Sequence, residues 1–132
     1  MGQPVAKQGD RVVGLDTHVV LISSPAGPVP TPLPSPFSGP LSRELSSTVC
    51  VDNSYAATVG SQAQNTPSHI PVGGPFQRPP SNQATVKAGS STVFADNRGV
   101  ARAGDPAECC NDPADSPTGH VVAAGTVLAG GE

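Results

Sequence analysis

The 132-residue sequence has few charged side chains, few aromatic side chains and no long apolar segment. Charged residues make up 13% of the chain, aromatic residues make up 3%, and tryptophan is absent. A chain so poor in large apolar residues builds only a small core, and ordering costs about 1.5 kcal/mol per residue. We therefore expect the fold to need further stabilisation, by a bound ligand such as a metal ion or by a partner.

These shortages also exclude classes of function. Lysine and arginine total 7 and nowhere cluster, and the net charge is −3, which argues against binding to nucleic acid. No apolar run approaches the roughly 18 residues of a membrane span, and the N-terminus lacks the apolar core of a signal peptide. We therefore expect synthesis in the cytoplasm and no stable membrane insertion.

Cysteine is also scarce. Of the three cysteines, Cys109 and Cys110 are adjacent, so a disulfide framework is not expected. A reducing compartment, in which cysteine is free to bind metal, fits this pattern better. Cys50 lies in a predicted strand, at a position where a related segment has Phe94, and is predicted to be a small core residue.

Glycine and proline are abundant instead, with 15 and 16 residues. Between residues 23 and 40 proline recurs at every second or third position, which excludes a helix or a central strand. We predict a long extended loop there. Such a composition is also typical of disordered chains, so a flexible linker is the alternative.

A repeat argues against disorder. Residues 46–61 (SSTVCVDNSYAATVGS) and 90–105 (SSTVFADNRGVARAGD) align without a gap, and each reads as a strand, an Asp-Asn turn and a second strand. A third copy appears when the chain ends are joined, with residues 126–130 running into residues 2–10. No segment has a helical period. The sequence therefore predicts an all-β fold of three pseudo-threefold β-hairpin units, closed by pairing of the N- and C-terminal segments.

This repeat defines the predicted domain organisation. Because repeat copies lie on both sides of the proline-rich segment, we expect a single domain over residues 1–132. The proline-rich segment 23–40 is then a loop of that domain, and residues 106–117 are an insert.

The three histidines occupy related positions in this repeat. His18, His69 and His120 each open a short apolar strand, so a threefold arrangement would bring them together near its axis. Three imidazoles and one thiolate, from Cys109 or Cys110, would make a closed tetrahedral set of the kind that holds structural zinc. Ordinary surface or core histidines are the alternative. One structural zinc ion would supply the stabilisation that the small core lacks.

At these residues the chain resembles the PAAR-repeat proteins, the small conical tips of contractile injection machines such as type VI secretion systems and phage-tail-like particles. The segments that match the family's motifs are Gly99–Asp105, Gln3–Asp10 and, more loosely, Ser54–Ser61, together with Asp16–His18 and His69–Pro75. The family often has His or Cys four residues after the last Gly-Asp, and Cys109 holds that position here. No copy has the full Pro-Ala-Ala-Arg sequence, and Val20 replaces a cysteine that some members carry.

The resemblance implies a small cone with one zinc ion near its apex, held by His18, His69, Cys109 and His120, with Cys110 as the alternative thiolate. It implies a structural role with no catalytic residues: the cone would cap and sharpen a trimeric β-helical spike of the VgrG type, for puncturing target membranes. Effector cargo is a further candidate partner, and contact with a target membrane would be transient. The protein would assemble in the cytoplasm, form the tip of the particle, and be delivered outside the cell or into the target.

Two other functions stay open on the sequence alone. The chain would otherwise be a proline- and glycine-rich adaptor or cargo-linking protein that folds on binding its partner. A small zinc hydrolase is the second alternative, and it requires a metal with an open position for water. No Gly-x-Ser-x-Gly sequence or other nucleophile motif supports an enzyme.

Overall fold

The computed structural model describes residues 2–130, and these residues form strands, bridges and turns but no helix. The ends of the domain predicted over residues 1–132, at residues 1, 131 and 132, lie outside the described residues. The strands are β1 (Gln3–Pro4), β2 (Arg11–Ile22), β3 (Val29–Arg43), β4 (Cys50–Val51), β5 (Ser54–Tyr55), β6 (Gln62–Gln64), β7 (Gln83–Val86), β8 (Phe94–Ala95), β9 (Arg98–Gly99), β10 (Pro106–Cys109), β11 (Ser116–Val122) and β12 (Leu128–Ala129). Accordingly, the described part of the chain has no helix long and apolar enough to cross a membrane.

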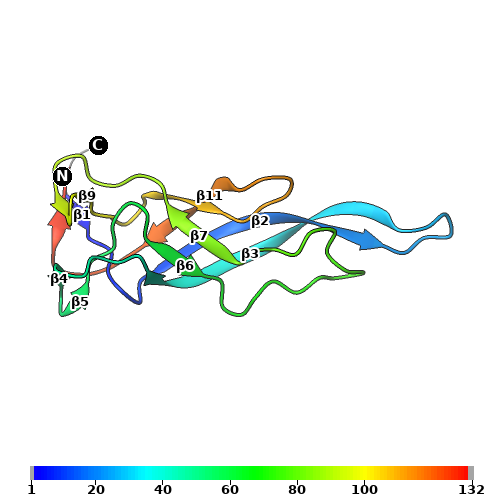
Figure 1. Cartoon of the computed structure of the whole chain (residues 1–132), viewed down its shortest axis with the longest axis horizontal. Helices are drawn as coiled ribbons and strands as arrows, with labels where there is room; N and C mark the ends of the chain where they lie inside the picture. Colours follow the sequence, from blue (N-terminus) through cyan, green and yellow to red (C-terminus); the bar gives the residue numbers. More distant parts are fainter. Residues whose placement is uncertain (1, 131–132) are drawn as a thin grey trace.

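Three two-stranded sheets gather at one end of the molecule, where both chain termini also lie (Figure 1). They are β4–β5, β8–β9 and β1–β12, which correspond to the three predicted copies of the repeat. In the third sheet Gln3 is opposite Ala129 and Pro4 is opposite Leu128. The predicted all-β class and the predicted pairing of the two chain ends are therefore confirmed.

The turns of the two continuous hairpins have the conformation that their Asp-Asn sequences favour. Asp52 and Asn53 have φ angles of 47° and 67°, and Asp96 and Asn97 have φ angles of 51° and 66°. Two consecutive residues in the left-handed region make the tight turn that matches the twist of a β-hairpin, and Asp and Asn tolerate that region better than other non-glycine residues.

A closed cycle of backbone hydrogen bonds joins the three hairpins. The Ala6 amide donates to the Ala101 carbonyl at 2.8 Å, Ala101 donates to Ala57 at 2.9 Å, and Ala57 donates back to Ala6 at 2.9 Å. All three alanines are fully buried. The hairpins around them pack on a small core of their own, made of Val5, Val51, Ala56, Ala95, Val100 and Ala129.

The hairpins lead directly into a barrel. After each copy a glycine with a φ angle of 91° to 97° donates its amide to a barrel strand: Gly9 to Leu41, Gly60 to Val86 and Gly104 to Val121. Only glycine adopts this backbone conformation without strain. The turn therefore recurs three times because three chain segments pass from the hairpins into the barrel.

The barrel is closed and has six antiparallel strands in the order β10–β11–β2–β3–β6–β7. Its interior holds the main core, in which Phe37 and Leu41 are the largest fully buried side chains. The repeat predicted the hairpins but not this barrel. Within the barrel, closure removes the free sheet edges that would otherwise invite association.

The prediction of a proline-rich loop over residues 23–40 is wrong for most of that segment. Residues 29–43 form β3, which pairs with β2 in an unbroken register from Arg11 opposite Pro40 to Ile22 opposite Val29. Figure 1 shows this hairpin projecting beyond the barrel, at the end opposite the chain termini. The prolines occupy alternate positions, so their missing amides all lie on the strand edge that faces away from β2.

The predicted insert at residues 106–117 is likewise part of the barrel. It supplies all of β10 and the first two residues of β11, and only the segment between these strands is a turn. Pro106 is opposite His120, and Ala107 is opposite both Gly119 and Val86, so β10 lies between β11 and β7. The sequence did not indicate this because each partner lies outside the repeat.

Two aspartates join neighbouring hairpins. Asp96, in the β8–β9 turn, accepts hydrogen bonds from the hydroxyl groups of Ser46 and Thr48, which precede β4. Asp52, in the β4–β5 turn, accepts from the amide and hydroxyl of Thr126, which precedes β12. The Ser46 and Thr48 bonds lower the pKa of Asp96, and the Thr126 bonds lower that of Asp52.

These bonds predict that the end of the molecule formed by the three short hairpins, called the hairpin end below, is sensitive to acid. A pKa lowered on folding stabilises the fold above the unfolded value of 3.8 and ceases to do so as pH falls through the lower folded value. Asp96→Asn should lower the free energy of unfolding at about pH 7, measured by urea unfolding. It should also reduce the further decrease of that free energy between about pH 7 and about pH 3. The exposed Asp115→Asn is the control. Equal acid sensitivity of native and Asp96→Asn protein would contradict this assignment.

Candidate metal centre

Strand β2 places two polar side chains on its buried face. Along this face Val12, Asp16, His18 and Val20 are each 2% exposed or less. Alternate residues of a strand share a face, so Asp16 and His18 project in the same direction. A carboxylate and an imidazole on a face otherwise made of apolar residues are costly to bury without partners.

The partners come from two other parts of the chain. His69 lies in the segment between β6 and β7, and Cys110 directly follows β10. The His69 Nε2 atom is 2.9 Å from Asp16 Oδ2, and Cys110 Sγ is 3.4 Å from the same oxygen and 3.5 Å from His18 Nε2. One atom from each of Asp16, His18, His69 and Cys110 lies within 4.8 Å of all the others.

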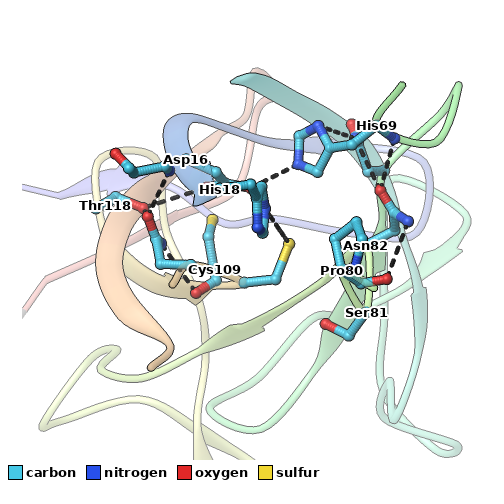
Figure 2. Close-up of polar contacts among 12 residues, drawn as sticks. Asp16, His18, His69, Pro80, Ser81, Asn82, Cys109 and Thr118 are labelled. Atoms are coloured by element: carbon cyan, nitrogen blue, oxygen red, sulfur yellow. Dashed lines mark hydrogen bonds and ion pairs between the residues drawn. The ribbon is translucent and has the colours of Figure 1, made fainter. Parts of the chain in front are cut away.

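Figure 2 shows the His69 ring turned toward Asp16 and His18 from the far side of the cluster. Two asparagines fix the chain that carries His69. The side-chain oxygen of Asn82, Oδ1, accepts from the backbone amide of His69 at 2.8 Å, and the backbone amide of Asn65 donates to the backbone carbonyl of Asn82 at 2.7 Å. The Asn65 side chain also lies 3.2 Å from His69 Nδ1. Asn65 and Asn82 thus close the base of the segment and hold His69 over β2.

His18 shows the electrostatic character of the cluster. Burial lowers its pKa, and the nearby His69 lowers it further, so the neutral imidazole that a metal requires is favoured. Its Nδ1 atom is buried without a hydrogen bond, 3.7 Å from Asp112 Oδ2. A metal-bound histidine commonly directs its second ring nitrogen to a carboxylate, which is the position Asp112 holds here.

Burial also disfavours the thiolate form of Cys110. Burial and the neighbouring Asp16 raise the pKa of Cys110 to about 11, so without a cation the thiol keeps its proton at neutral pH. Thr118 donates a hydrogen bond to the second oxygen of Asp16 at 3.3 Å. A cation among these four groups would compensate the carboxylate and favour the thiolate. The buried Asp16, His18, His69 and Cys110 can therefore hold a metal ion.

The structure brings together His18 and His69 of the predicted set, with the alternative thiolate Cys110 in place of Cys109. Cys109 is fully buried in the barrel core, where its Sγ atom packs against Gly119. Burial and the charge of Asp16 raise the pKa of Cys109, so this thiol also lies near Asp16, but it is not one of the four residues whose ligand atoms lie within 4.8 Å of one another.

His120 is placed elsewhere. It is exposed on β11, between Val13 and Pro106 in the barrel wall, and it is not a member of the cluster. Its position in the repeat suggested convergence, but β11 turns this residue outward. Asp16 completes the cluster instead. Its only sequence signal was the Asp-x-His spacing, which places two polar side chains on one strand face. Cys50 was predicted to be a core residue and is exposed.

The chain was compared with protein-family models, curated proteins and solved structures, and none of the three comparisons found a match. The function must therefore be argued from the chain's own residues.

The burial of the thiols predicts unequal reactivity. Cys50 is exposed, whereas Cys109 and Cys110 are buried and their pKa values are raised to about 12 and about 11. At neutral pH a thiol-specific dye should label one cysteine of the folded chain rapidly, because the thiolate is the reactive form. Cys50→Ser should abolish that fast phase, and Cys109→Ser should leave it unchanged. Three equally fast thiols would contradict the buried cluster.

Proposed function

We propose that this protein is a metal-stabilised tip of a contractile injection machine, similar to the PAAR-repeat proteins, and that its hairpin end caps a trimeric β-helical spike. The observation that carries the proposal is the threefold cycle of hydrogen bonds among the hairpins. A single chain with this pattern presents nearly the same surface in three directions, as a partner with true threefold symmetry requires.

The side chains at this end repeat in the same way. Val49, Val93 and Val127 are 37%, 40% and 42% exposed, and the carbonyl of each accepts an amide from the returning strand of its own hairpin at 2.9 to 3.0 Å. The residues that follow Val93 and Val127 are Phe94 and Leu128, each 58% exposed. Exposed apolar residues that recur around an axis favour a binding surface over scattered surface residues.

The short hairpins also leave backbone groups for a partner. Each has only two residues per strand, so its strands end at the surface where the chain termini lie (Figure 1). A blunt β-helical trimer could continue these strands by pairing at their edges. The apolar side chains would then pack against the last layer of the spike.

Zinc is the proposed metal. Two imidazoles, a thiolate and a carboxylate are all ligands of zinc, whereas a thiolate disfavours magnesium and calcium. Tetrahedral zinc, with bonds of about 2.0–2.3 Å, sets its ligand atoms about 3.3–3.6 Å apart. Among the four groups the distances of 3.4 and 3.5 Å around Cys110 Sγ fit this spacing, and the 2.9 Å contact between His69 and Asp16 is only slightly shorter.

The proposed role is mechanical and not enzymatic. Four protein ligands leave no position for a reactive water on tetrahedral zinc. The ion would instead tie the segment that carries His69 to β2 and to the end of β10, beyond the barrel core. Such a chain would assemble in the cytoplasm, travel at the front of the spike and leave the cell with it.

The zinc proposal predicts about one zinc ion per chain, measured by mass spectrometry under non-denaturing conditions. His69→Ala should abolish zinc binding and lower the melting temperature by at least about 10 °C, because structural zinc supplies much of the folding free energy of small domains. His120→Ala is the matched control, since His120 is exposed outside the cluster, and it should keep both properties. A chain that melts identically with and without chelator would contradict the proposal.

The docking proposal predicts a complex of one chain with one spike trimer, measured by light scattering after gel filtration. Val93→Asp should weaken this complex at least about tenfold, because a charge would be buried against the spike. The control is Val122→Asp, at a similarly exposed valine on β11. If both variants bind alike, or if three chains bind each trimer, the hairpin end is not the docking surface.

A further inference from the structure

The four groups of the metal cluster are enclosed by the protein. Asp16, His18 and Cys110 are 0%, 1% and 2% exposed, and the His69 side chain is 2% exposed. A metal ion held among them would be almost completely covered, so its entry and release are expected to require motion of the chain. Which part moves depends on how firmly each ligand is held.

Three of the four ligands lie on or beside paired strands. Asp16 and His18 are inside β2, whose residues pair with β3 from one end of the strand to the other. Cys110 directly follows β10, which pairs with both β7 and β11. The next residue, Asn111, accepts the Thr17 amide on its side-chain oxygen at 2.7 Å and so ties the end of β10 to β2. These three ligands therefore keep their places as long as the strands stay paired.

His69 is held in a different way. It belongs to residues 67–74, a segment without strands that we call the lid. The chain is fixed on both sides of the lid, because the Thr66 amide donates to β3 at 3.0 Å and the Pro75 carbonyl accepts an amide of β2 at 2.8 Å. Within the lid itself, His69 makes every hydrogen bond to the residues that the structure describes. Figure 2 shows this side chain as the one that reaches the cluster from the far side.

The hydrogen bonds of His69 are few for the length of chain that they order. Its amide donates to Asn82 at 2.8 Å, and its two ring nitrogens lie 3.2 Å from the Asn65 side chain and 2.9 Å from Asp16. Three hydrogen bonds contribute less free energy than eight residues lose in conformational entropy when they are ordered. The lid therefore needs packing or a further ligand to stay closed.

Packing supplies little of this. Ile70 and Val72 are 73% and 70% exposed, so the apolar side chains of the lid are not buried. A cavity of about 410 Å³ lies between these two residues and Pro34 of β3. A second cavity, of about 230 Å³, separates them from Leu33 and Phe76. Open space thus borders the lid where a firmly packed segment would make contact.

We infer that residues 67–74 are a metal-dependent lid, which opens when the site is empty and closes when His69 binds the metal ion as its last ligand. The inference rests on the proposed metal site. Coordination links His69 to the ion far more strongly than a hydrogen bond links it to Asp16, and this bond holds the lid. Asp16, His18 and Cys110 form the standing part of the site, and the ion leaves only after the lid has opened.

A second path to the cluster provides the competing explanation. A cavity of about 190 Å³, with Arg78, Pro80 and Ser81 in its wall, reaches His18 and Cys110. Entry through this cavity would require no motion of the lid. It would also let a chelator attack the ion directly, so the kinetics of metal release separate the two paths.

The first experiment measures zinc release from the whole chain to an excess of a coloured chelator by stopped-flow absorbance. If the lid must open first, the release rate should level off as the chelator concentration rises, because opening then becomes the slow step. A rate that stays proportional to chelator concentration throughout would overturn the inference.

A pair of glycine variants tests closure of the lid. Gly74→Ala should raise the limiting release rate at least about tenfold, because an added Cβ atom would collide with the Leu21 carbonyl oxygen of β2 in the closed lid. Gly27→Ala is the control, in the turn between β2 and β3, where an added Cβ atom meets nothing within 4 Å. It should leave the rate unchanged. Equal rates for the two variants would count against a lid.

The second experiment measures backbone order parameters by NMR with and without zinc. The amides of Ile70 and Gly73 should have values of about 0.85 with zinc, as in rigid backbone, and below about 0.6 without it. Thr17 and Val19, on β2 beside the cluster, should keep the rigid value in both states. A lid that stays rigid without zinc, or a β2 that loses order together with the lid, would refute the inference.

These outcomes separate the lid from the proposed function. A chain that binds no zinc would overturn both the metal-stabilised tip and the lid. A chain that binds zinc but has a rigid lid without it would keep the metal and capping roles and lose the lid alone.

Discussion

The closed cycle of hydrogen bonds among Ala6, Ala57 and Ala101 is the constraint on which the rest of the structure depends. Each amide donates to the next hairpin, so each hairpin supports one neighbour and is supported by the other. The backbones approach so closely that the three alanines are completely buried. A larger side chain there would have to displace two hairpins at once. The cycle also requires the two ends of the chain to meet, because the third hairpin is formed by both.

The barrel extends the same arrangement. The glycines that follow the three hairpins each donate the backbone amide to a barrel strand, as the bonds from Gly60 to Val86 and from Gly104 to Val121 illustrate. Closure of the barrel then fixes β2, whose buried face carries Asp16 and His18 past the end of the apolar core. The metal cluster thus lies at the edge of the main core, to which Cys110 also belongs. A metal would tie together there the segments that have few apolar contacts of their own.

The proline-rich strand β3 shows that the same spacing of prolines is compatible with either a loop or a strand. Proline every second residue is compatible with an extended loop, and it is also compatible with a strand whose missing amides all face one free edge. The choice between them depends on β2, which supplies an unbroken ladder on the other edge of β3. Local propensity therefore excluded a helix correctly, but it could not exclude a strand. The partner that stabilises this strand is recognised only from the register.

The sequence by itself determined the hairpins, because their signals are local: the Asp-Asn turns, the strand residues beside them and the repeated glycine all lie within a few positions. It also indicated that the chain ends pair and that His18 and His69 lie together, since both follow from the repeat. Tertiary structure decided the barrel, the replacement of His120 by Asp16 and the choice of Cys110 over Cys109. These depend on which face of a strand meets which neighbour. The pairing of strands that are distant in the sequence sets that contact. A shift of one residue in this pairing would move each side chain of a strand to the opposite face.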